Sequence, residues 1–145
     1  MFRLKTILLL VAFVALAQML TVFRPARLPA YFHAPRNLLR PLIAMGTSLG
    51  LLIFLLKWGE RLPRSELLLL LIGTAGALAN LADLLRLGAV VDFIPFAFQT
   101  VASPGDLLSF TGFLIFLPLS FRNTWRGQGL GRMQFNWWKR THHQS

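Results

Sequence analysis

Four long apolar stretches, separated by shorter polar segments, constrain the fold of this 145-residue chain more than any other feature. They cover residues 6–23, 41–56, 66–82 and 106–121, so each holds 16 to 18 residues. A helix that rises ~1.5 Å per residue needs about 20 residues to cross a ~30 Å hydrocarbon core. A slightly shorter span is accommodated by local thinning of the bilayer. The pattern predicts an all-α membrane protein in which residues 1–145 form one integral membrane domain with four transmembrane helices.

The segments between these blocks are irregular and polar. Residues 24–40 contain three prolines, and Pro41 is well placed in the first turn of the second helix. Ser65 is predicted to be the N-cap of the third helix. The mixed stretch 83–104 is expected to form a small extracytoplasmic loop and β region. Residues 122–145 form a basic tail, which is predicted to lie at the membrane surface or to be partly disordered.

The first apolar block has a second interpretation. It follows a short basic segment with Arg3 and Lys5, and the sequence Ala15-Leu-Ala17 resembles the cleavage site of a secretory signal peptide. The apolar run continues beyond Ala17 as far as Phe23, which favours a retained transmembrane helix. Cleavage remains the alternative.

The residue types in the chain exclude several kinds of chemistry. There is no cysteine, so disulfides, thiolate metal sites and cysteine nucleophiles are ruled out. The three histidines, at positions 33, 142 and 143, do not have the spacing of metal ligands. The serines have no plausible histidine partner for nucleophilic catalysis. We therefore expect no metal and no cofactor.

The formal net charge is +10, which occurs in proteins that bind nucleic acid and also in membrane proteins. In a membrane protein, basic residues flank the transmembrane helices and bind anionic lipid headgroups. The chain has no soluble basic domain that could bind double-stranded nucleic acid. The expected partners are therefore membrane lipids, with no nucleic acid, and a monomer is expected.

The basic residues also predict the orientation in the membrane, because cytoplasmic segments carry an excess of lysine and arginine. Four transmembrane helices place both termini on one side. The side with the termini carries ten basic residues: Arg3, Lys5, Lys57, Arg61, Arg64, Arg122, Arg126, Arg132, Lys139 and Arg140. The other side carries five: Arg24, Arg27, Arg36, Arg40 and Arg86. Both termini are predicted to be cytoplasmic, and the four tryptophans lie near that same face, as an interfacial belt would.

All three aspartates of the chain, Asp83, Asp92 and Asp106, fall on the outer side, at or near the ends of the third and fourth blocks. A carboxylate close to lipid is costly and is a functional candidate by default. The structural alternative is a solvated loop in which Asp106 caps the fourth helix. Two adjacent carboxyl groups can share one proton and so supply an acid and a base together. Such a pair can activate water and protonate a carbonyl oxygen or a leaving amine, which is peptide hydrolysis without a metal, serine or cysteine.

The sequence around these aspartates resembles that of a known family. The segment 73–94, GTAGALANLADLLRLGAVVDFI, is similar to the pattern of the lipoprotein signal peptidases (signal peptidase II), which is roughly G-N-x-x-D-R followed after about seven residues by V-x-D-F. The second pattern of the family is near F-N-x-A-D and precedes the last transmembrane helix, where this chain has Ala-Ser-Pro-Gly-Asp106. The resemblance covers about 35 residues. The first half of it is fairly specific and the second half is weaker.

The resemblance implies a membrane aspartyl endopeptidase of the bacterial cytoplasmic membrane. Such an enzyme removes the signal peptide of a prolipoprotein just before the diacylglyceryl-cysteine. The catalytic residues it implies are Asp92 and Asp106, and the substrate-binding or supporting residues are Asn80, Asp83 and Ser103. The prolipoprotein is then the substrate partner.

The chain departs from the family pattern at two motif positions. Leu84 replaces an arginine, with Arg86 two residues further on, and Ser103 replaces an asparagine. An N-x-G-A-A-F-like element is also missing from the first outer loop. The alternative interpretation is therefore a non-catalytic relative, either a membrane subunit or a protein that binds a lipid or lipopeptide.

Overall fold

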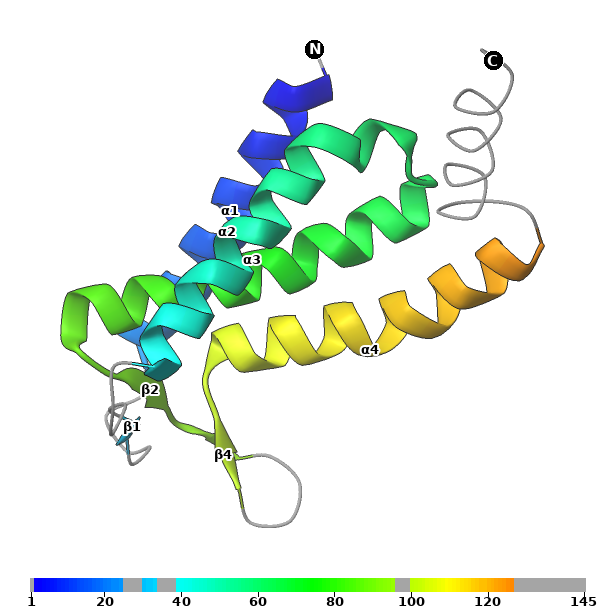
Figure 1. Ribbon diagram of the computed structural model, residues 1–145. Coiled ribbons are helices and arrows are strands. Elements are labelled where there is room, and N and C mark those ends of the chain that lie inside the picture. The colour runs from blue at the N-terminus through cyan, green and yellow to red at the C-terminus, as the bar shows by residue number, and fades with distance from the viewer. Residues whose placement is uncertain (1, 25–29, 34–38, 96–99, 127–145) are drawn as a thin grey trace.

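The computed structural model describes residues 2–24, 30–33, 39–95 and 100–126, and four long helices dominate this part of the chain (Figure 1). They are α1 (Phe2–Val22), α2 (Leu39–Trp58), α3 (Arg64–Leu87) and α4 (Pro104–Trp125). All four are long and apolar enough to cross a membrane. The predicted all-α membrane fold with four transmembrane helices is therefore confirmed.

The helices extend beyond the apolar blocks from which they were predicted. Lysine and arginine can continue a helix at a membrane surface, because their long side chains bring the charge back to the headgroups. Pro41 lies in the first turn of α2, as expected. The N-cap prediction for Ser65 is wrong: α3 begins at Arg64 after an extended Pro63, with no side-chain cap. The short connection between α2 and α3 contains a 3-10 turn, η1 (Gly59–Arg61).

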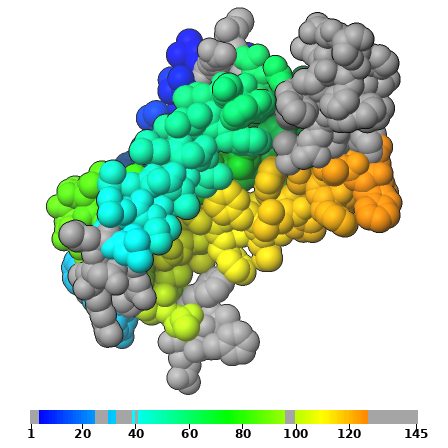
Figure 2. All heavy atoms as spheres, viewed as in Figure 1, coloured from blue at the N-terminus to red at the C-terminus, as the bar shows by residue number. Residues whose placement is uncertain are grey.

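Helix α3 is the centre of the bundle, because it contacts α1, α2 and α4. In Figure 1, α1 and α2 lie on one side of α3 and α4 runs along it, and in Figure 2 much of α3 is hidden behind α2. Most other large apolar side chains on the helices face outward, as expected for contact with lipid. One cluster of buried apolar side chains lies within the bundle, and its members are Leu10, Leu55, Leu62, Leu70, Leu71, Ala75 and Phe116.

Helices α3 and α4 touch backbone to backbone at glycines. A Cβ atom added at Gly112 would collide with the backbone of Gly73, and one added at Gly76 would collide with the backbone of Gly105 and Ser109. Small residues permit this close approach between membrane helices. Gly73 and Gly76 of α3 therefore lie in close contact with α4.

In the described part of the chain, four short strands lie at the end of the bundle where α3 ends and α4 begins (Figure 1). Strand β1 (Tyr31–His33) pairs antiparallel with β2 (Val90–Asp92), and β3 (Ile94–Pro95) pairs antiparallel with β4 (Val101–Ala102). Strands β2, β3 and β4 confirm the small β region that was expected between the third and fourth transmembrane helices, whereas β1 comes from the connection between α1 and α2.

Two sequence-based expectations concern the C-terminal segment. The basic tail was predicted to begin at residue 122, but α4 continues to Trp125. Residues 127–145, with Trp137 and Trp138 of the expected aromatic belt, lie outside the described residues.

Candidate active site

Asp106 lies in the first turn of α4, where a capping box fixes its backbone and its carboxylate. The Ser103 hydroxyl accepts a hydrogen bond from the Asp106 backbone N–H at 2.9 Å, and the Ser103 backbone N–H donates to Oδ2 of Asp106 at 3.2 Å. Pro104 follows the cap, where a residue without an N–H is tolerated. The sequence Ser-Pro-Gly-Asp therefore folds locally into a helix start in which Ser103, and not Asp106, is the N-cap, while Asp106 completes the capping box.

Asn80 binds Asp106 from the neighbouring helix. Its Nδ2 donates a hydrogen bond to Oδ1 of Asp106 at 2.6 Å, and its Oδ1 accepts one from the Ser103 hydroxyl at 2.8 Å. Both oxygens of the Asp106 carboxylate therefore accept hydrogen bonds, one from the cap and one from α3. An acceptor-only carboxylate with two donors is well satisfied in its ionised form.

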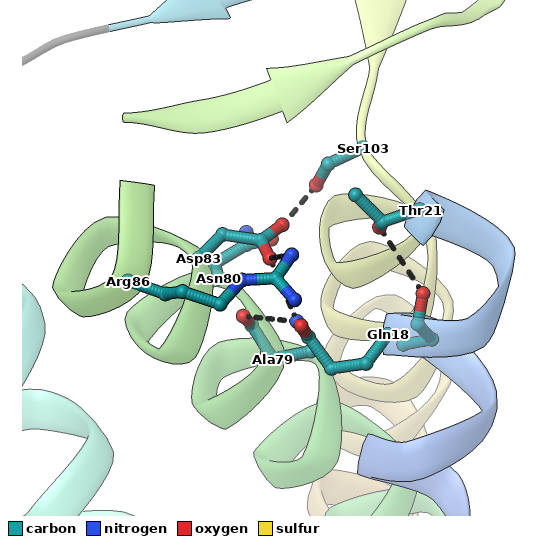
Figure 3. A network of polar contacts seen from close by, with 8 residues as sticks. Gln18, Thr21, Ala79, Asn80, Asp83, Arg86 and Ser103 are labelled. Carbon is teal, nitrogen blue, oxygen red and sulfur yellow. Dashed lines mark hydrogen bonds and ion pairs between the residues drawn. The ribbon is translucent and has the colours of Figure 1, made fainter. Parts of the chain in front are cut away.

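Asp83 lies one helical turn after Asn80 but has different partners. It is 2% exposed and accepts a hydrogen bond at 2.9 Å from Nε2 of Gln18, which also donates to the carbonyl oxygen of Ala79 at 3.0 Å. Arg86 is 3.8 Å from the same Asp83 oxygen (Figure 3). This group joins α1 to the C-terminal part of α3, beside the Asn80 cluster.

Asp92 is the last residue of β2, within the stretch predicted to form a loop and β region, and is 4% exposed. It pairs with Tyr31 across the β1–β2 ladder. The next residue, Phe93, donates its backbone N–H to the Ala102 carbonyl at 3.2 Å, and Ile94 pairs with Ala102. Because β3 and β4 are antiparallel, this register brings Asp92 alongside the segment that leads into α4.

The structure thus joins three of the five predicted site residues, Asn80, Ser103 and Asp106, by direct hydrogen bonds. It places Asp83 in a separate polar group and Asp92 on the adjoining strand. Gln18 was missed by sequence reasoning, although a lone amide in an otherwise apolar block is a recognisable signal. Among the residues that the structure describes, no cluster of three histidines or carboxylates could hold a metal ion.

Fold and site together define a multi-pass membrane protein with carboxylates gathered at one end of its helix bundle. The model of the signal peptidase II family matches residues 30–121, which is more than half of the chain and includes Asn80, Asp92 and Asp106. The chain belongs to the signal peptidase II family. At this level it is a bacterial multi-pass membrane protein of an aspartic peptidase family that processes lipoproteins.

Comparison with solved structures supports the fold independently. The chain is similar to a bacterial membrane enzyme whose structure was determined by the in meso method, with a TM-score of 0.59 and 17% sequence identity. The similarity covers 83% of this chain and 89% of the other. No curated protein matches this sequence significantly.

Proposed function

We propose that this protein is an active membrane aspartyl endopeptidase that removes signal peptides from prolipoproteins just before the diacylglyceryl-cysteine. Asp92 and Asp106 would be its catalytic residues. The observation that carries the proposal is the setting of Asp106, whose carboxylate is held by Asn80 and by the Ser103 cap beside the strand segment that follows Asp92. Because the chain belongs to the signal peptidase II family, we assign peptide-bond hydrolysis to this arrangement.

The proposed reaction needs one ionised and one protonated carboxyl group. The ionised group takes a proton from water while the water oxygen attacks the scissile carbonyl carbon, and the protonated group gives its proton to the carbonyl oxygen. The tetrahedral intermediate then collapses: the C–N bond breaks, the amine leaves with the proton that the base had taken, and the carbonyl re-forms as its hydroxyl returns its proton to the carboxylate that had supplied it. The pair returns to one proton in total, so the cycle balances.

We assign Asp106 as the base in this cycle. Its two oxygens already accept N–H donors, which is the arrangement that suits a charged carboxylate. Asp92, which is almost completely buried on β2, would carry the shared proton. The substrate's acyl chains would stay in the lipid beside the outer ends of the helices, and both termini of the enzyme would be cytoplasmic.

Substitution of each aspartate tests the proposal. Asp92→Asn and Asp106→Asn each keep the side-chain shape and should each lower kcat on a lipidated precursor peptide by at least about a thousandfold, with the double variant hardly worse than either. Glu60→Gln, which changes an exposed carboxylate at the other end of the bundle, is the control. Wild-type turnover by either single variant would disprove the aspartyl mechanism.

The departures from the family motif favour one other candidate, a non-catalytic protein that binds the lipopeptide. Leu84 stands in place of the motif arginine, and Arg86 is directed to Asp83 within the same helix. If purified wild-type protein binds a lipidated precursor peptide and never cleaves it, while the same peptide is cut by an active family member, this second function replaces the first.

A further inference from the structure

Ser103 uses its hydroxyl in two directions at once. It is the N-cap of α4 and has no exposed surface. Its oxygen accepts the Asp106 backbone N–H at 2.9 Å, and its one hydrogen is donated to Oδ1 of Asn80 at 2.8 Å. A hydroxyl has only one hydrogen to give, so this donation assigns the Asn80 oxygen to the side that faces Ser103.

This assignment determines which end of the Asn80 amide meets the carboxylate. With its oxygen directed to Ser103, the amide must present its NH₂ group to Asp106, as the 2.6 Å hydrogen bond shows. An unrestrained asparagine could turn over whenever Asp106 takes up a proton, because a protonated carboxyl group can donate to the amide oxygen. Because the Ser103 hydroxyl donates to the amide oxygen, it opposes this rotation and favours the orientation with the N–H donor at Asp106.

Gly105 provides the space in which this amide lies. A Cβ atom at position 105 would collide with Oδ1 of Asn80 and would lie 2.7 Å from its Cγ, closer than side-chain contacts allow. Only glycine lets the Asn80 side chain pass over the first turn of α4 and reach both Ser103 and Asp106. Any side chain at position 105 would push the amide out of the cluster.

We propose that Ser103 is a positioning residue that acts on Asp106 through Asn80, with Gly105 as the glycine that makes their contact possible. The proposal deepens the proposed function and rests on it, since it concerns the carboxylate assigned as the base. It also explains how a serine works where the family motif has asparagine, because a hydroxyl and an amide can both accept one hydrogen bond and donate another.

Steady-state kinetics with a lipidated precursor peptide provide the first test. Ser103→Ala and Ser103→Gly both remove the hydroxyl and should lower kcat about tenfold to a hundredfold, the range expected when a reacting group is misplaced by about 1 Å, while KM stays within about twofold. Ser103→Thr keeps the hydroxyl and should retain kcat within about threefold, and Ser103→Asn should also recover part of the loss.

Two controls separate positioning from helix stability. Ser109→Ala removes another hydroxyl from the α3–α4 interface, one that donates to the Gly73 carbonyl at 3.3 Å, and should leave kcat near the wild-type value. Glycine is nearly as good an N-cap as serine, whereas alanine is poor. If Ser103→Gly is as active as wild type and only Ser103→Ala is impaired, capping explains the effect and the proposal is wrong.

A spectroscopic measurement is independent of turnover. In protein labelled with ¹⁵N in its four asparagines, the side-chain amide signal of Asn80, identified by its loss in Asn80→Ala, should move in Ser103→Ala and Ser103→Gly and stay in place in Ser109→Ala. An unchanged Asn80 signal in the Ser103 variants overturns the positioning proposal. If the Asn80 signal moves in the Ser103 variants but the wild-type protein never cleaves substrate, the proposed function is refuted and the positioning role of Ser103 stands.

Discussion

Nδ2 of Asn123 donates a hydrogen bond of 2.7 Å to Oε1 of Glu66, a glutamate without any exposed surface, at the opposite end of the bundle from Asp106. The Ser120 hydroxyl donates to the other oxygen of Glu66 at 3.4 Å. Helices α3 and α4 are therefore joined by polar contacts at both ends, with the glycine contacts between them. A buried carboxylate is tolerated here because the neighbouring helix supplies its donors.

Removal of this carboxylate should destabilise the fold. Glu66→Ala leaves the buried donors of Asn123 and Ser120 without their acceptor, so the free energy of unfolding in detergent micelles should fall by about 1–3 kcal/mol. Glu66→Gln keeps one acceptor oxygen and should cost less. A double-mutant cycle with Asn123→Ala measures the coupling, and additive effects would show that the two residues do not stabilise each other.

The glycines between α3 and α4 allow a matched comparison within the chain. Gly76→Ala and Gly112→Ala place a methyl group against backbone of the other helix and should lower the unfolding free energy by about 1–3 kcal/mol. Gly46→Ala and Gly50→Ala lie on α2 with open space around them and should be neutral, or stabilising by up to about 1 kcal/mol. Equal effects in the two pairs would contradict the close packing of α3 on α4.

Asp83 is expected to support the site without reacting. Asp83→Asn should lower kcat less than either Asp92→Asn or Asp106→Asn. Gln18→Leu removes the hydrogen bonds that Gln18 donates to the buried oxygens of Asp83 and Ala79 and should lower the unfolding free energy by about 1–3 kcal/mol. Arg86→Gln should cost at most about 1 kcal/mol, because the guanidinium is half exposed. Chemical unfolding of the purified variants measures these free-energy changes. A larger loss of unfolding free energy in Arg86→Gln than in Gln18→Leu would show that Arg86, and not Gln18, is the more important partner of Asp83.

Membrane orientation can be measured cleanly in a chain without cysteine. Thr100 lies next to β4 and Lys57 in the last turn of α2, at opposite ends of the bundle, and both are exposed. With both termini in the cytoplasm, a membrane-impermeant maleimide should label Thr100→Cys in intact spheroplasts and should label Lys57→Cys only after lysis. The inverse pattern would show that the distribution of basic residues misleads in this protein.

The number and type of helices could be predicted because lipid leaves few alternatives for an apolar block of this length. Asp92, Asp106 and Asn80 could be selected because they match a motif. Their hydrogen bonds could not, since these depend on how α3 is rotated against α4. Gln18 escaped notice because its partners lie 61 and 65 residues away in the chain. Glu66 was expected only as the first residue of the third apolar block, and the packing of α4 over it shows that it is buried.

The glycine contacts also have a mechanical consequence. Where two helices meet through backbone, no layer of side chains remains between them that could be compressed or repacked. Helices α3 and α4, with Asn80 on one and Asp106 on the other, should therefore move as one body. Under the proposed function, space for a peptide would then open by displacement of α1, α2 and the short strands. The distance between Asn80 and Asp106 would stay constant during such a movement.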